Sequence, residues 1–273
     1  IRNTLAAYLK TDFAIPWADG ERLALGRETR VMGILNVTPD SFSDGGRHET
    51  PAAALEAAAR MAEGGAEIVD VGGESSRPGA GTVSEDEEVR RVLPVVEAIK
   101  RELAVRVSVD TCKAGVARRA LAAGADMIND VSPVVVMHMR GTPRTMQLDT
   151  DYVDLMASVT GYLRRAAEKA VNGGISDDKI LVDPGLGFGK SAAGNLQILR
   201  EMPSLRSLGR PILIGASRKS FIGAAMNLPV SERLEGSLAV AALAVWQGAH
   251  VVRAHDVAAT VRVVRMIDAV RAV

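Results

Sequence analysis

Short apolar runs alternate with longer, alanine-rich segments along most of the chain. The runs are rich in β-branched residues and are bounded by Gly, Asp or Asn, as at Val31–Asn36. Runs of this kind predict buried strands, while the longer segments, such as Pro51–Glu63, have the spacing of amphipathic helices. Repeated strand and helix units are typical of a parallel sheet covered by helices.

The predicted strands are Val31–Asn36, Ile68–Val71, Arg106–Asp110, Met127–Asp130, Val134–His138, Ile180–Asp183, Ile212–Gly215 and Val251–Ala254. The predicted helices are Pro51–Glu63, Ser84–Glu102, Ala114–Ala123, Tyr152–Val171, Gly194–Glu201, Arg218–Met226, Glu232–Gln247 and Val257–Val270. Because eight such units take about 250 residues, we expect residues 31–273 to form one α/β domain, a (β/α)8 TIM barrel. Residues 1–30 contain an Asp19–Gly20 turn signal, and we expect a short N-terminal extension that caps the barrel bottom.

One connection in this pattern is too short for a barrel. Only Val131, Ser132 and Pro133 separate Asp130 from Val134. A crossover between parallel strands takes about 10 to 12 residues or more. We therefore expect that a helix-bearing segment of the protein is missing from this sequence near residues 131–134.

Composition and charge agree with one large soluble domain. The chain has 273 residues, of which 47% are hydrophobic, and its 33 basic residues balance its 33 acidic residues. This balance of charges does not favour a surface that binds nucleic acid or membrane. Any anion-binding site must therefore be formed by a few basic or donor residues that the fold brings together. The single cysteine, Cys112, excludes an internal disulfide framework, and we expect it to pack in the following helix. With no long apolar stretch and no leader, a cytoplasmic location is expected, although the chain opens at Ile1 and a few residues are expected to precede it.

Polar side chains stand at the ends of the predicted strands, where a closed barrel would gather them on one face. They are Asn36, Glu74, Asp110, Asn129, Asp130, His138, Asp183, Ser217, Arg253 and His255. Asp and Asn also commonly cap helices or begin turns, and this alternative stays open for each of them alone. Helix capping and turn formation are a much weaker explanation for all of these residues together.

The loop after the first strand carries the most informative motif, NVTPDSFSDGG, at Asn36–Gly46. It is followed by DVGGESSRPGA at Asp70–Ala80, SVDT at Ser108–Thr111, INDV at Ile128–Val131, MHMRGTP at Met137–Pro143, DPGLGFGK at Asp183–Lys190, GASRK at Gly215–Lys219 and RAHD at Arg253–Asp256. Together these motifs resemble the dihydropteroate synthase family, collinearly from Val31 to the end. DPG and ND also occur in other pterin-binding barrels, so the first two loops and SRK carry the distinction.

The resemblance implies condensation of 6-hydroxymethyl-7,8-dihydropterin diphosphate with p-aminobenzoate, with release of pyrophosphate, in folate biosynthesis. A carboxylate can accept two parallel hydrogen bonds from the guanidine-like edge of a pterin, and Asp183 is our choice for it. By the resemblance, Asn129, Asp110, Met137, Gly215 and Lys219 complete the pterin site, with Asp110 and Lys219 also catalytic. Asp110 as a cap of the next helix remains the structural alternative.

The departing diphosphate needs cations and hydrogen-bond donors. Arg253 and His255, two residues apart on an extended segment, point to the same side. By the resemblance, Asn36 joins them and binds Mg2+, an ion that prefers oxygen ligands and takes few from the protein. His255 as a buried structural histidine is the alternative, and His138 is equally well explained as a brace for its loop.

The resemblance places p-aminobenzoate against Phe42, Ser76, Pro78 and Phe188, with the Ser220 backbone at its carboxylate. A loop Phe packed on its own barrel is the alternative reading of both aromatic residues. The first two loops look mobile from their composition, and we expect Asp44 and Arg77, which the resemblance makes catalytic, to approach each other when those loops close over the site. Ser76 stands where the family usually has Thr.

Further expectations follow from the resemblance and from the alternatives to it. Sulfonamides are expected inhibitors, and the apolar helix at Leu238–Trp246 either covers a homodimer partner or faces the core. A catalytically silent pterin-binding barrel would need a defect in one of the loops, and none is visible. A corrinoid-dependent methyl transferase module would leave Arg253, His255 and the p-aminobenzoate loops unexplained.

Overall fold

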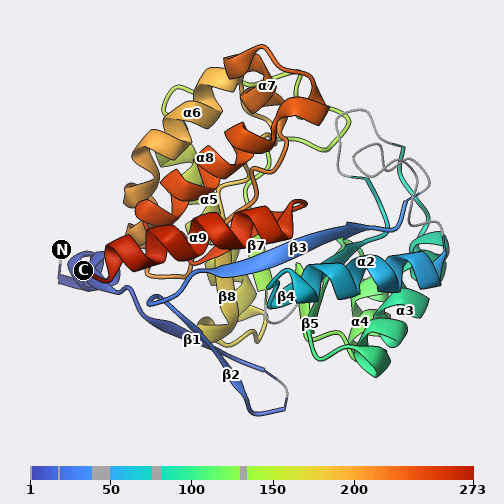
Figure 1. Ribbon diagram of the computed structural model, residues 1–273. Coiled ribbons are helices and arrows are strands. Elements are labelled where there is room, and N and C mark those ends of the chain that lie inside the picture. Colours follow the sequence, from blue (N-terminus) through green and yellow to red (C-terminus); the bar gives the residue numbers. More distant parts are fainter. Residues whose placement is uncertain (1, 18, 39–49, 76–80, 130–133) are drawn as a thin grey trace.

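Eight parallel strands form one sheet that curls into a barrel in the computed structural model of the chain (Figure 1). The structure describes residues 2–17, 19–38, 50–75, 81–129 and 134–273. The strand order is β8-β7-β6-β5-β4-β3-β10-β9, and a parallel bridge between Val182 and Ile212 joins the two ends. The barrel strands are β3 (Arg30–Asn36), β4 (Ile68–Gly72), β5 (Arg106–Asp110), β6 (Met127–Asn129), β7 (Val134–Met137), β8 (Ile180–Asp183), β9 (Leu213–Ile214) and β10 (Val251–Ala254).

Helices cover the outside of the barrel, as the alternation of strand and helix patterns predicts. They are α2 (Pro51–Glu63), α3 (Glu85–Glu102), α4 (Ala114–Ala122), α5 (Leu155–Asn172), α6 (Ala192–Glu201), α7 (Ser220–Met226), α8 (Leu234–Trp246) and α9 (Val257–Arg271), with 3₁₀ helices η1 (Asp177–Lys179), η2 (Met202–Leu208) and η3 (Val230–Glu232). Side-chain caps set several starts: Thr50, Ser84 and Asp154 each accept a hydrogen bond from the backbone N–H three residues later.

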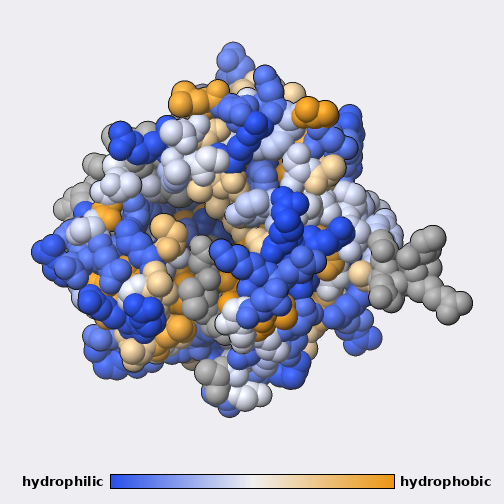
Figure 2. All heavy atoms as spheres, turned by 180° about the vertical axis from the view of Figure 1, so that it is seen from behind, coloured by the Kyte–Doolittle hydropathy of each residue, from blue (hydrophilic) through white to orange (hydrophobic). Residues whose placement is uncertain are grey.

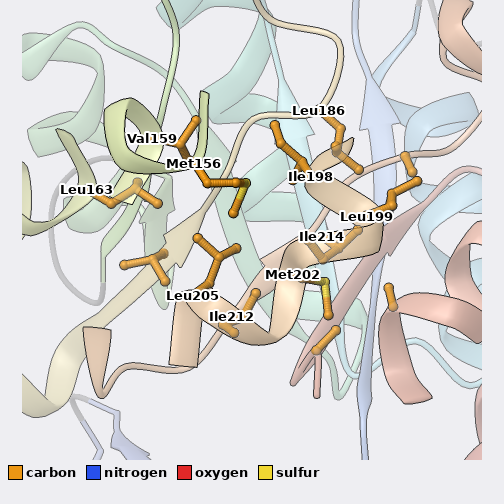
Figure 3. Packing of buried hydrophobic residues seen from close by; sticks show 14 of the residues in the cluster. Met156, Val159, Leu163, Leu186, Ile198, Leu199, Met202, Leu205, Ile212 and Ile214 are labelled. Atoms are coloured by element: carbon orange, nitrogen blue, oxygen red, sulfur yellow. The ribbon is translucent and has the colours of Figure 1, made fainter. Parts of the chain in front are cut away.

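The largest buried cluster lies between the barrel wall and helices α5 and α6 (Figure 3). Leu163 of α5, Ile198 of α6 and Leu205 of η2 are fully buried there. They pack against Ile212 and Ile214 at strand β9. The two-residue strand β9 therefore has side-chain packing in addition to its short ladder with β10.

The bottom of the barrel interior is apolar. Seven strands each contribute one inward residue to a single cluster: Met32, Ile68, Met127, Val135, Leu181, Leu213 and Val251. Ile15, Trp17 and Leu25 belong to the same cluster and come from an antiparallel hairpin of β1 (Phe13–Pro16) and β2 (Arg22–Leu25), which follows helix α1 (Arg2–Leu9). The hairpin lies at the amino end of the barrel strands (Figure 1).

The fold class is confirmed, and most element bounds match the sequence pattern within two or three residues. Helix α1 and the two hairpin strands were not predicted, because runs this short have too little periodicity. The expectation for Cys112 is wrong: β5 ends at Asp110 and α4 begins at Ala114, so Cys112 is exposed in the bend between them.

The crossovers between barrel strands in the described part of the chain each include a helix. Strands β6 and β7 are parallel neighbours, with Ile128 opposite Val134. Residues 130–133, on which the expectation of a missing segment falls, lie outside the described residues. The missing segment therefore stays a prediction.

The face of the molecule opposite to the view of Figure 1 is mainly hydrophilic, with scattered hydrophobic residues and a hollow near its centre (Figure 2). Among the helices of the described residues, none combines the length and the apolar character needed to cross a lipid bilayer.

His250 ties strand β10 to the chain before the hairpin. Its Nδ1 accepts a hydrogen bond from the Ile212 N–H at 3.1 Å, so the proton of the neutral ring is on Nε2, which donates to the carbonyl of Thr11 at 3.1 Å. The ring also meets Phe13 edge to face at 5.0 Å. Burial lowers the pKa of His250 to about 4, because a charged imidazole would lose water and the Ile212 contact.

The free energy of unfolding should fall as the pH drops from 6.5 toward 4. In that window the unfolded chain binds a proton at His250 that the native protein does not bind. The expected loss is about 1.4 kcal/mol per pH unit for one such histidine. Urea unfolding between about pH 4.5 and 7 measures it, and His250→Asn, which cannot titrate, should have a shallower slope by about one proton. An unchanged slope would contradict this assignment.

Candidate active site

The carboxyl end of the barrel gathers the polar strand ends. Asn36, Gly72 and Asp110 lie side by side in register on β3, β4 and β5. A Cβ placed on Gly72 would lie 3.5 Å from Asn36 Oδ1 and 3.8 Å from Asp110 Cβ. The missing side chain of Gly72 therefore leaves room for two polar groups to share this edge of the opening.

An ion network crosses the barrel interior one layer deeper. Arg253 Nε donates to Asp70 Oδ2 at 2.6 Å, and its Nη2 donates to Asp110 Oδ2 at 2.8 Å. Asp70 is fully buried, and 84% of the Arg253 side chain is buried. Although burial disfavours its charge, Asp70 and Asp110 outweigh this effect and raise the pKa of Arg253. The guanidinium is thus a fixed cation within the barrel.

Asp70 was not predicted as a site residue. The sequence does hold a signal for it, because an acid in the middle of the apolar strand Ile68–Gly72 needs a buried partner. Strand alternation places Ile68, Asp70 and Gly72 on the same, inward side. The position opposite, Arg253, has the same signal in strand β10.

Two carboxyl groups of the site have a raised pKa. Asp183 ends β8, is 8% exposed, and accepts a hydrogen bond on Oδ1 from the Gly185 N–H at 2.7 Å. Burial raises the pKa of Asp183, and the Gly185 contact opposes the rise. The pKa of Asp110 is also raised, mainly by its removal from water inside the barrel, with Arg253 opposing and Asp70 adding to the effect.

Lys219 brings a second cation to this end of the barrel. It is the N-cap of α7, and its Nζ lies 3.9 Å from the centre of the Phe188 ring, a cation–π contact. Burial lowers the pKa of Lys219 to about 8, assisted by Arg253 and opposed by Asp183 and Asp110. A fraction of Lys219 is therefore neutral near neutral pH.

The segment after β10 places His255 beside Ser217. The Nδ1 of His255 and the Ser217 hydroxyl are 3.0 Å apart, and the His255 N–H donates to the same hydroxyl at 3.2 Å. Burial, followed by the charge of Arg253, lowers the pKa of His255 to about 3. As a neutral ring, His255 would serve an anion as a hydrogen-bond donor and not as a cation.

Arg218 is held in an ion pair with Asp256. Arg218 Nε donates to Asp256 Oδ2 at 3.0 Å, and Nη2 donates to Asp256 Oδ1. His138 matches the brace interpretation: it is 4% exposed, and its ring meets Tyr162 edge to face. Burial lowers the pKa of His138 to about 4.

The structure brings together Asp110, Arg253, Asp183, Lys219 and Phe188 through the contacts and charges described above. The other predicted residues at this end of the barrel are Asn36, Met137, Gly215, Ser220 and His255, at or just after the ends of β3, β7, β9 and β10. Phe42, Asp44, Ser76, Arg77, Pro78 and the side chain of Asn129 lie outside the described residues.

The donor set at this edge suits a hard cation held by few protein groups. In the described part of the chain, no three His, Cys, Asp or Glu side chains cluster as metal ligands. Mg2+ keeps several waters and binds substrate phosphates, so one protein oxygen is enough. The amide oxygen of Asn36, next to Asp110 across Gly72, fits such an ion.

Comparison with known proteins assigns the family. A family model described as "Pterin binding enzyme" matches residues 32–133 and 132–255. The dihydropteroate synthase of Escherichia coli K12 is 45% identical over 269 residues, which are 93% of this chain and 95% of the relative. The chain belongs to the dihydropteroate synthase family.

Solved structures of the dihydropteroate synthase family share the barrel. The Yersinia pestis enzyme, crystallised with a sulfonamide drug complex, has a TM-score of 0.91 and 42% identity, covering 96% of this chain and 100% of its own. The Xanthomonas albilineans enzyme with 4-aminobenzoic acid has a TM-score of 0.86 and 45% identity, covering 95% and 99%. The two stretches matched by the family model meet at residues 132–133, beside the short connection between β6 and β7.

Replacing Asp70 should reveal how much the barrel depends on its ion network. In Asp70→Asn, Arg253 keeps Asp110 but loses its charged bond to the buried strand. We expect the free energy of unfolding to fall by about 1.5–3 kcal/mol, the usual range for a hydrogen bond to a charged group. Urea unfolding at pH 7 measures the change.

The matched control is Asp86→Asn, which breaks an exposed ion pair with Arg119. Its expected change is below about 1 kcal/mol. Equal losses in the two variants would show that the buried network has no special weight in stability.

Proposed function

We propose that this chain joins 6-hydroxymethyl-7,8-dihydropterin diphosphate to p-aminobenzoate and releases pyrophosphate, the dihydropteroate synthase reaction of folate biosynthesis. The observation that carries the proposal is the meeting of Asp183, Asp110, Lys219 and Arg253 at the carboxyl end of one barrel. The 4-aminobenzoic acid in the Xanthomonas albilineans structure and the sulfonamide in the Yersinia pestis structure support it.

The pterin would bind against the carboxylate of Asp183. Its guanidine-like edge offers two parallel donors, which would form hydrogen bonds with the buried carboxylate of Asp183. The Gly185 N–H already fixes the orientation of this carboxylate. Asn129 at the end of β6, together with Met137 and Gly215 on the inward side of their strands, would complete the pocket.

The chemical step replaces a C–O bond by a C–N bond. The amine nitrogen of p-aminobenzoate attacks the pterin methylene carbon, the bond to the diphosphate oxygen breaks, and its electron pair leaves with pyrophosphate. The new amine then loses a proton. Asp110 would stabilise positive charge at the methylene, and Lys219, between the pterin and aminobenzoate positions, would hydrogen-bond the pterin.

The leaving diphosphate would lie at the opening, near Arg253, His255 and Asn36. Arg253 supplies permanent positive charge, while neutral His255 supplies a donor. Mg2+ at Asn36 would neutralise charge on the diphosphate oxygens. Stabilising the leaving group in this way favours the transition state over the bound substrate.

The second substrate would lie between Phe188 and the start of α7. Phe188 and Lys219 already form a cation–π pair, and the Ser220 backbone stands at the first residue of the helix. Phe42, Ser76 and Pro78 would complete this site, and closure of their loops would bring Asp44 to Arg77. These assignments rest on the motifs.

Pyrophosphate release tests the proposal. The protein, Mg2+ and the pterin diphosphate should release pyrophosphate only when p-aminobenzoate is added. A silent pterin-binding barrel would bind the pterin without release, and a methyl transferase module would ignore the aminobenzoate. No release with all components present would overturn the proposal.

Within the same assay, Asp183→Asn should lower kcat/KM by roughly 10- to 100-fold, because an amide can accept only one of the two pterin hydrogen bonds while its own donors face donors. The control Asp86→Asn should behave as the unmodified protein, since Asp86 is exposed on α3.

The exposed apolar side of α8 is proposed to cover the partner in a homodimer. Leu243 is 40% and Trp246 58% exposed, while Ala241, Ala244 and Val245 on the same helix are buried. The helix therefore faces both the core and the surface. A cytoplasmic location is proposed as well, because the single cysteine, Cys112, fits a reducing compartment.

Sedimentation equilibrium should give twice the chain mass for the native protein. Trp246→Asp should shift it toward the monomer, because a charge would replace an apolar contact of the interface. The surface control is Arg262→Asp, at an exposed position of helix α9, and it should have no effect on the mass. A monomeric native protein would remove the dimer from the proposal.

A further inference from the structure

Lys190 is a buried lysine that the proposed reaction does not use. It is 3% exposed and ends the glycine-rich segment that follows strand β8. Its Nζ donates to the carbonyl oxygens of Gly185 at 2.8 Å, Phe188 at 2.8 Å and His138 at 3.2 Å. An ammonium has three donors and no acceptor, so the three carbonyls match its charged form.

The segment 185–190, here called the Phe188 loop, is pinned at further points. Gln147 donates to Gly187 O at 2.9 Å, Tyr152 donates to Gly189 O at 2.8 Å, and Asn195 Oδ1 accepts from the Gly187 N–H at 2.7 Å. Every carbonyl from 187 to 189 is thus bound by a side chain.

The Phe188 loop also lies in close contact with neighbouring residues. Gly185, Gly187 and Gly189 all have positive φ, where side chains are strained. A Cβ on Gly185 would lie 2.0 Å from the carbonyl oxygen of His138, and one on Gly187 would lie 3.1 Å from Lys219 Cδ. These close contacts of the loop backbone accompany the observed position of Phe188, beside the Lys219 ammonium.

We infer that Lys190 is a positioning residue for the aromatic amine substrate: its ammonium fixes the Phe188 loop so that Phe188 and Lys219 form the wall on which the amine's ring stacks. The inference rests on the proposed function. It assigns Lys190 no contact with substrate; the residue acts through the backbone of residues 185 and 188.

The loop should loosen when Lys190 loses its proton, because a neutral amine has two donors and turns a lone pair toward one of the three carbonyls. The charged and titratable groups around it are Asp183 on β8, Lys219 at α7, and His138 and Arg140 after β7. Burial lowers the pKa of Lys190 to about 7, with Asp183 opposing and Lys219 adding to the fall. Binding of the amine should therefore weaken as the pH rises through that value.

Steady-state kinetics of Lys190→Met test the inference. Methionine fills a similar volume without donors, so we expect the KM for p-aminobenzoate to rise about tenfold or more, while the KM for the pterin diphosphate changes less than about twofold. Lys169→Met, on the exposed side of α5, is the matched control and should leave both constants unchanged.

Lys190→Arg separates charge from structure. A permanently charged side chain should restore part of the p-aminobenzoate affinity and remove the rise of its KM near pH 7, leaving only the rise near pH 8 that loss of the Lys219 proton causes. A merely structural lysine would leave this pH profile unchanged. Hydrogen exchange reports independently of activity: the Phe188 N–H, bonded to Gly185 O at 3.1 Å, should exchange faster in Lys190→Met.

The outcomes are distinguishable from those of the proposed function. If the native protein forms no product, the proposed function fails while faster exchange at Phe188 still measures the loop. If the native protein is active, an unchanged KM for p-aminobenzoate in Lys190→Met, or equal rises in both KM values, overturns the inference. Should Lys190→Met not fold, Lys190→Gln and the pH dependence of KM in the native protein decide it by the same criteria.

Discussion

The pairing of Arg253 with Asp70 and Asp110 is the constraint on which the upper half of the barrel depends. A lone guanidinium in the barrel interior would cost several kcal/mol. The bonds reach from β10 past β3 to β4 and β5 and thus join strands that are not neighbours in the sheet. The apolar layer below, closed by Ile15 of the hairpin, stabilises the fold without charge. The lower layer of the barrel therefore stabilises the fold by apolar packing, and the upper layer places charged side chains around the site.

The upper layer contains groups whose pKa values move toward one another. Burial raises the pKa of Asp183 and Asp110 and lowers those of Lys219 and Lys190 to about 8 and 7. The charged form of each group is less stable in the barrel than it would be in water. Folding has already removed water from these acids, at a cost in free energy. A ligand that donates hydrogen bonds to them replaces the lost water contacts, and this replacement contributes to its affinity.

The sequence predicts the positions at which strands end more reliably than the use made of each side chain. Asp110 and Asp183 were found because polar residues follow apolar runs, whereas Lys219 came from the resemblance carried by the GASRK motif. Asp70 was missed because site residues were sought only at strand ends, and Asp70 lies in the middle of β4. The alternation of side chains along a strand nevertheless places it on the inward side. Lys190 was missed for another reason. A lysine in a glycine-rich segment suggests exposure, and only the fold shows three carbonyls around its nitrogen. The hairpin strands carry too few residues for a period to be seen.

The Phe188 loop shows why a binding surface can require buried charge behind it. Three glycines give the loop its tight course but also the largest loss of conformational freedom on ordering. Side chains from two separate segments bind its backbone, namely Gln147 and Tyr152 of the β7–α5 connection and Asn195 of α6, and Lys190 binds it from within. Because these bonds are made before any ligand arrives, the entropy of ordering Phe188 is already lost on folding. A ring stacking on Phe188 therefore does not have to supply it, and preorganisation of this kind raises affinity without adding a contact.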